Sequence, residues 1–162
     1  MSSVSPTDPV LTEIENTLQA CVVSDVDLHR VLDRILARFA CVAGTIHLLN
    51  PMSGLLELRA QRGLPPIVIE RTREVPIGKG MAGLAAERRE PMQICNLQTD
   101  QSNVARPVAK ETKMAGSIAL PMLVGDSLRG TIGVAKSYEY AFPEAEIDLL
   151  LQIGTLIGKH QT

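Results

Sequence analysis

Two pairs of short apolar runs constrain the fold of this chain more than any other feature. A loop containing proline and glycine separates the first two runs, and Gly125-Asp126 separates the second two. Apolar runs joined by such turn residues are typical of β-hairpins, which pair their strands antiparallel. The sequence therefore predicts an antiparallel sheet. The four runs are residues 44–50, 55–61, 116–124 and 127–136.

Helical periodicity precedes the first hairpin. Apolar residues recur every three or four positions over residues 28–39, and Ser24 with Asp27 has the spacing of a capping box. An earlier helix is predicted to begin at Asp8-Pro9, because proline suits the first helical position. Between the hairpins we expect a short helix, an extended piece followed by a glycine turn and a helix, and a strand. These segments are residues 66–74, 74–90 and 91–95.

The last helix is predicted over residues 142–160 and is apolar on more than one side. Such a helix must bury both sides, so one covers the sheet and the other requires a second helix, from this chain or from a partner. Gly154 and Gly158 form a G-x-x-x-G step that permits close approach of another helix. This two-sided helix favours a homodimer built through the terminal helices.

The order of these elements indicates an α+β domain of about five or six strands, with the terminal helices on one face of the sheet. A chain of 162 residues fits a single domain, which we expect over residues 9–162 after a disordered tail at 1–8. The net charge of -2 argues against nucleic-acid binding. No signal peptide or membrane span is recognisable, and an odd set of three cysteines favours a reducing, cytoplasmic location.

Four stretches in a fixed order resemble a GAF domain. They are the first hairpin (GTIHLLNPMSGLLELRAQRG), the glycine stretch (VPIGKGMAGLAAERREPMQICNL), the second hairpin (GSIALPMLVGDSLRGTIGVAKS) and the helix start at Phe142. The resemblance covers residues 28–159 and implies a central antiparallel sheet, with terminal helices on one face and a ligand pocket with short helices and loops on the other. It also implies a sensor or dimerisation module that works beside an output domain. No output domain is recognisable in this sequence, so we expect a small stand-alone module with a signalling partner that the sequence does not identify.

Two motifs within this resemblance point to nucleotides. Residues 78–83 satisfy G-x-G-x-x-G, but that fingerprint requires parallel strands around a helix, so a tight turn is the better interpretation. Cyclic-nucleotide GAF domains carry an Asn-Lys, Phe, Asp-Glu pattern, of which this chain retains Lys136 and Phe142, with Glu146 as a conservative change. The plain alternative is a surface pair of Lys136 and Glu146 beside a buried Phe142. Aromatic residues for base stacking are scarce, at 2% of the chain.

Cys95 is the candidate for redox chemistry, and His47 is the candidate for cofactor binding. The free methionine-(R)-sulfoxide reductases are GAF proteins with cysteines in loops around the pocket, and Cys95 is the pocket-side candidate here. The corresponding loop, residues 99–121, contains no cysteine, which disfavours this enzyme class. His47 lies in a predicted strand, and a lone histidine is a weak sign of haem. We therefore expect no catalytic residue, metal or cofactor.

The sequence thus favours a non-catalytic sensor that binds a small molecule between the sheet and residues 94–117. Arg106, Lys110 and Lys113 fall at helical spacing there and suggest a small, anionic metabolite. A ligand-free interaction scaffold remains the third alternative, since an apolar pocket and an apolar core have the same sequence pattern. The predicted ligand-binding residues are His47, Met81, Cys95, Asn96, Arg106, Lys110 and Ser117, with Ser102 and Asn103 adding polar groups nearby.

Overall fold

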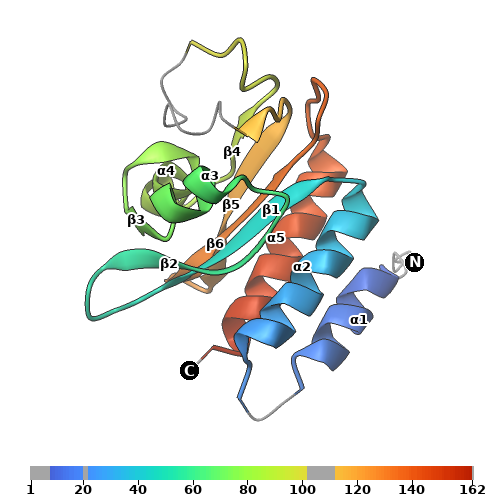
Figure 1. The fold of residues 1–162 in the computed structure, drawn as a ribbon. Coiled ribbons are helices and arrows are strands. Elements are labelled where there is room, and N and C mark those ends of the chain that lie inside the picture. Colours follow the sequence, from blue (N-terminus) through green and yellow to red (C-terminus); the bar gives the residue numbers. More distant parts are fainter. Residues whose placement is uncertain (1–7, 20–21, 102–111, 162) are drawn as a thin grey trace.

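A computed structural model describes residues 8–19, 22–101 and 112–161. Its centre is a six-stranded sheet with the order β3-β2-β1-β6-β5-β4, in which every neighbouring pair is antiparallel. Both predicted hairpins are present, and β1 joins them by pairing with β6 (Figure 1). The predicted α+β class is confirmed. The strands are β1 (Ala43–Leu49), β2 (Leu55–Arg62), β3 (Glu74–Pro76), β4 (Met92–Ile94), β5 (Ser117–Val124) and β6 (Ser127–Ala135).

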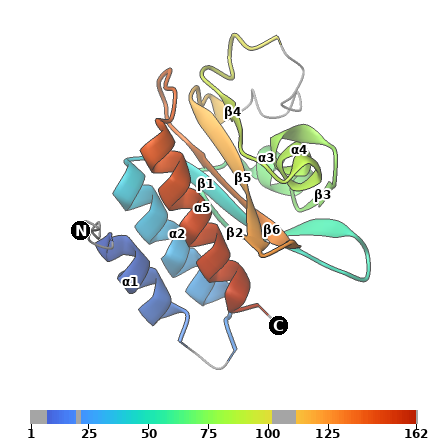
Figure 2. The same cartoon turned by 180° about the vertical axis from the view of Figure 1, so that it is seen from behind.

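Helices from both ends of the chain cover one face of this sheet (Figure 2). They are α1 (Pro9–Thr17), α2 (Asp25–Phe39) and α5 (Glu144–Lys159). Their starts follow the sequence signals, since the Asp8 side chain accepts from the amide of Val10 and Ser24 forms a capping box with Asp27. No helix within the described ranges is long and apolar enough to cross a lipid bilayer.

The main core lies between these helices and the sheet. Alternate strand residues such as Ile46, Leu120 and Ile132 are fully buried there, in one cluster with the apolar residues of α2 and α5. Helix α1 packs on both α2 and α5, with Ile14 fully buried. The second apolar side of α5 is therefore covered by a helix of this chain. A helix from a partner is not needed to cover it, so this side of α5 no longer argues for the predicted homodimer.

The prediction for the G-x-x-x-G step is wrong. Gly154 and Gly158 face the sheet rather than another helix, because a Cβ on Gly154 would lie 3.3 Å from Met122 Cγ and a Cβ on Gly158 would lie 2.9 Å from Val124 Cγ2. The missing side chains let α5 sit close to β5 and β6. Their spacing of four residues fits one face of a helix, and the sequence does not reveal what that face contacts.

The opposite face of the sheet carries α3 (Pro66–Arg71) and α4 (Gly80–Arg88) (Figures 1 and 2). Helix α3 ends at Arg71, earlier than the predicted residue 74. Helix α4 packs on β5 and β6, and Gly83 fits against the preceding turn, where a Cβ would come within 2.5 Å of the Pro76 carbonyl oxygen. This close approach supports the tight-turn interpretation of residues 78–83.

The predicted surface pair of Lys136 and Glu146 is also wrong, although Phe142 is buried as expected. Lys136 follows β6 and is only 3% exposed. Its ammonium group donates to the carbonyl oxygen of Phe39, at 2.6 Å, at the end of α2. Glu146 instead accepts a hydrogen bond from the Tyr140 hydroxyl at 2.5 Å.

Candidate functional site

A cavity of about 150 Å³ lies on the sheet face opposite the terminal helices. Its floor is made of alternate residues of the neighbouring strands β1, β6 and β5, because residues two apart in a strand share a face. Thr45 and His47 come from β1, and Ser117 from β5. The neighbouring positions of these strands face the helices. The other floor residues are Ala119, Gly133 and Ala135.

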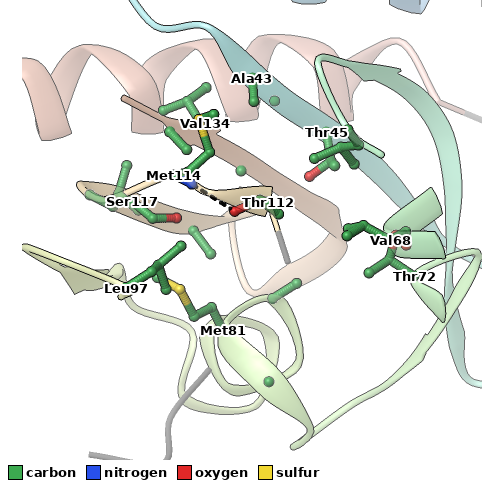
Figure 3. A pocket seen from close by; sticks show the side chains of 18 of the residues that line it. Ala43, Thr45, Val68, Thr72, Met81, Leu97, Thr112, Met114, Ser117 and Val134 are labelled. Carbon is green, nitrogen blue, oxygen red and sulfur yellow. Dashed lines mark hydrogen bonds between the residues drawn. The ribbon is translucent and has the colours of Figure 1, made fainter. Parts of the chain in front are cut away.

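The opposite wall comes from the segments that cross this face (Figure 3). Helix α3 contributes Val68, the start of α4 contributes Met81, and Leu97 and Met114 close another side. These side chains are apolar, so the lining suits an apolar ligand with few polar groups. Among the polar lining groups, the Thr112 hydroxyl already accepts a hydrogen bond from the amide of Met114 at 3.0 Å.

His47 is the buried titratable residue of this lining. It is 2% exposed, and its Nε2 lies 2.8 Å from the carbonyl oxygen of Thr72. A carbonyl oxygen only accepts, so Nε2 carries the proton in this hydrogen bond. Burial lowers the pKa of His47, although the hydrogen bond to Thr72 opposes that shift. The neutral ring therefore has an unprotonated Nδ1, which is buried and has no hydrogen-bond partner.

The structure brings together three of the predicted binding residues. His47, Met81 and Ser117 all line the cavity. Cys95 is exposed and Asn96 uses its side chain to accept from the amide of Gln98, and neither contributes to the described lining. Ligand binding by these five residues stays a prediction.

The predicted basic cluster is placed only in part. Arg106 and Lys110 lie outside the described residues, as do Ser102 and Asn103. Lys113 is exposed, has a left-handed backbone with φ of 59°, and is not part of the described lining. The charged residue in that lining is Lys79, which is exposed just before α4.

Sequence reasoning missed most of the apolar wall. Thr45 could have been found, because it lies two positions before His47 in a predicted strand and so shares its face. No spacing in the sequence indicates that Val68 and Thr72 share a face with His47. They reach the cavity because the segment after β2 folds back over the sheet, which is a tertiary event.

The two described cysteines differ in environment. Cys41 is buried beside the end of α2, and burial raises the pKa of its thiol to about 11. A thiol with that pKa stays protonated at neutral pH and is a poor nucleophile. Cys95 is exposed, so it does not serve as a packing residue of the core. No group of three or more potential metal ligands occurs among the described residues.

Comparison with protein families agrees with this architecture. The GAF domain model matches residues 25–159, from the start of α2 to the end of α5. This chain belongs to the GAF family. A comparison with curated protein sequences finds no match.

Solved structures show how widely this GAF fold is shared. The chain is similar to the GAF domain of a phosphoenolpyruvate-protein phosphotransferase from Coxiella burnetii, with 20% identity, 94% and 90% of the two chains covered and a TM-score of 0.78. The GAF domain of an Acinetobacter phosphoenolpyruvate-protein phosphotransferase is 18% identical, with 97% of this chain and 93% of that chain covered and a TM-score of 0.79. Free methionine-R-sulfoxide reductase from Neisseria meningitidis is 14% identical, with 99% of this chain and 94% of that chain covered and a TM-score of 0.73. At these identities, the similarity establishes the fold.

Proposed function

We propose that this GAF domain is a non-catalytic sensor or regulatory module that binds a small molecule in the cavity between the sheet and α3, α4. The cavity itself carries the proposal, because it combines an apolar lining with an unpartnered polar atom of His47. A few polar groups in an apolar pocket are typical of small-molecule sites.

The two cysteines that the structure describes support a non-catalytic function over a sulfoxide reductase. A cysteine enzyme requires a reactive thiolate close to its substrate. The thiol of Cys41 is held protonated by burial, and Cys95 lies outside the described cavity lining. Fold similarity to sulfoxide reductases keeps the enzyme as the alternative to be tested.

Ligand binding is tested by a thermal-shift panel of organic acids, amino acids, cyclic nucleotides and small neutral aromatics. A ligand specific for the folded state stabilises it by about 2.7 kcal/mol at a hundredfold excess over Kd. Ala119→Leu fills the cavity floor and should abolish the shift, whereas Val22→Leu at an exposed position should retain it. A shift that survives Ala119→Leu would place binding elsewhere. No saturable shift in the panel would favour the scaffold.

The reductase alternative is tested by assaying the wild-type protein with free methionine sulfoxide and a thiol recycling system. We expect no turnover. Turnover that disappears in Cys95→Ser would identify a redox enzyme and overturn the proposal. Because Cys95 is exposed, this substitution should change the free energy of unfolding by less than about 0.5 kcal/mol.

The proposed assembly is a cytoplasmic homodimer that acts on a signalling partner. Val22 and Val26, exposed by 81% and 62% beside the start of α2, supply apolar surface at the terminal helices. Sedimentation at micromolar concentration tests the dimer, and Val26→Glu should weaken it. A 17.5 kDa species over the whole concentration range would exclude it.

A further inference from the structure

Gly133, inside β6, is a glycine that the fold itself does not explain. Glycine weakens the interior of a strand, and it is usually kept there for a bulge, for a positive φ, or for the close approach of another backbone or of a ligand. The pairing of β6 with β1 and with β5 runs in regular register through Gly133, and its φ lies outside the left-handed region. The first two reasons are therefore absent.

The space beside Gly133 is open on the cavity side. Among the described residues, a Cβ at this position would have two non-neighbouring atoms within 4 Å, Thr45 Oγ1 at 2.9 Å and the carbonyl oxygen of Ile118 at 3.9 Å. The second distance is an ordinary contact, so no described backbone fills this space. By contrast, a Cβ on Gly130 in the same strand would overlap the carbonyl oxygen of His47. Because Gly133 lines the cavity, approach of a ligand is the reason that remains for a glycine there.

The hydroxyl of Thr45 lies at the edge of this open position. Thr45 is directly opposite Gly133 in the pairing of β1 with β6. Its side chain is half-buried and lines the cavity, on the side across from Ser117 and Leu97 (Figure 3). No hydrogen bond holds this hydroxyl within the described part of the chain, and it is not one of the fully enclosed polar atoms there. A polar ligand atom above Gly133 is therefore within reach of Thr45 Oγ1.

The surroundings of this position favour an uncharged ligand with an apolar body. Ala119 continues the floor next to Gly133, and Leu97 and Met114 in the wall are apolar. The charged residue of the described lining, Lys79, is exposed at the start of α4, so a charge above the floor would be desolvated without a partner from that lining. A hydroxyl both donates and accepts, and so pairs with an uncharged hydroxyl or carbonyl group. An apolar cavity of about 150 Å³, the volume found here, holds a molecule as large as benzene.

We infer that Gly133 is a specificity-determining residue of this cavity, which leaves room for a small, uncharged, mainly apolar molecule whose polar group hydrogen-bonds to the hydroxyl of Thr45. This inference rests on the proposed function, because it names the ligand class and the contact position in the same cavity. It differs from the anionic ligand that the basic residues of the sequence suggest. A glycine kept for a ligand implies that alanine removes binding without weakening the fold.

Gly133→Ala tests this implication. The urea midpoint of the ligand-free variant should equal or exceed that of wild type, because alanine restricts the unfolded chain and Thr45 has other rotamers that avoid the new methyl group. Its affinities for phenol and toluene, measured by calorimetry, should each fall by about tenfold or more. Gly130→Ala is the control and should lower the midpoint, since its Cβ overlaps backbone. Unchanged affinities in Gly133→Ala, or a midpoint lowered as far as in Gly130→Ala, would overturn the inference.

Thr45→Val tests the hydrogen bond. Phenol and toluene have the same shape and differ in one hydroxyl group, so the ratio of their affinities isolates the polar contact. We expect this ratio to be about tenfold higher in wild type than in Thr45→Val, with toluene binding retained. Thr45→Ser keeps a hydroxyl and should keep the wild-type ratio, and Thr12→Val, exposed on α1, is the matched control. Equal ratios in wild type and Thr45→Val would remove Thr45 from the ligand contact.

The outcomes separate this inference from the proposed function. Tighter binding of benzoate than of phenol by wild type would show that the site prefers an anion, and would overturn the ligand class. Absence of phenol and toluene binding, together with saturable binding of another compound of the thermal-shift panel, would also reject this class but leave small-molecule binding in place. Absence of every saturable shift would instead remove the proposed function, and this inference with it.

Discussion

The ammonium group of Lys136 donates to the carbonyl oxygen of Phe39 at 2.6 Å, across 97 residues of chain. It lies also 3.4 Å from the carbonyl oxygen of Ala40, the left-handed residue that ends α2. The rings of Tyr138, Tyr140 and Phe142 have their centroids within 5.9 Å of the same nitrogen. All four aromatic residues of the chain therefore contribute a ring or a carbonyl to the site of Lys136. This cation satisfies helix-end carbonyls and links the last strand to α2.

Replacing Lys136 should destabilise the domain strongly. Lys136→Met retains much of the aliphatic stem but leaves the Phe39 carbonyl without its charged donor, so we expect a loss of about 2–3 kcal/mol in the free energy of unfolding. Urea unfolding followed by circular dichroism measures it. Lys159→Met, at an exposed position of α5, is the control and should cost about 0.5 kcal/mol or less. Similar losses in both variants would contradict the role of Lys136.

Tyr140 should give a stability loss in alkaline solution. Its hydrogen bond to Glu146, assisted by burial, raises the pKa of Tyr140 to about 12. The folded state therefore holds this proton more tightly than the unfolded state, whose tyrosine pKa is about 10. Its contribution to stability is complete below about pH 10 and is lost as the pH rises toward 12.

Tyr140→Phe provides the test, because the chain has only two tyrosines. An absorbance titration of the phenolate should lose its step near pH 12 in this variant, and the alkaline stability loss should shrink. Disappearance of a step near pH 10 instead would show that Glu146 does not hold the proton on Tyr140.

His47 should give a stability loss in acid. Burial lowers the pKa of His47 in the folded state, so the unfolded chain, with a histidine pKa of about 6.5, binds the proton first. The free energy of unfolding should therefore fall as the pH decreases below about 6.5 and through the folded pKa. Urea unfolding from pH 8 to pH 5 should show a steeper loss in wild type than in His47→Leu. Parallel curves would mean that His47 is charged in the folded protein or is accessible to water.

Gly83 should resist substitution despite its position in a helix. Alanine normally stabilises a helix by about 0.5–1 kcal/mol relative to glycine. A Cβ here would approach the Pro76 carbonyl oxygen to 2.5 Å, so we expect Gly83→Ala to destabilise the protein by about 1–3 kcal/mol. The same clash shifts the start of α4 and Met81, and should weaken ligand binding in the cavity. Glu87→Ala, exposed on the same helix, is the control, and a melting temperature raised by Gly83→Ala would contradict this packing.

Much of the fold could be predicted from local patterns. The caps at Asp8 and Ser24, the turn at Gly125-Asp126 and the apolar runs of β1 and β5 each depend on residues close in sequence. Such signals are read from short windows, because helix and strand periods repeat every few residues. Element ends were less certain, as α3 shows by ending at Arg71 rather than near residue 74.

The candidate site was predicted less completely. His47, Met81 and Ser117 were found from their place in the family pattern, and they line the cavity. The wall formed by Val68 and Thr72 was not found, since no spacing in the sequence connects α3 to the face of β1.

The sequence by itself determined the elements, their order and their class, because these follow from local periodicity and turn chemistry. The tertiary structure decided which parts of the chain each helix and strand face contacts. It buried Lys136 against the end of α2, directed Gly154 at the sheet, and placed α1 over the second apolar side of α5. It also buried His47 in the cavity lining with its Nδ1 atom unpartnered. Contacts between residues far apart in sequence depend on packing and desolvation in three dimensions, which no periodic pattern encodes.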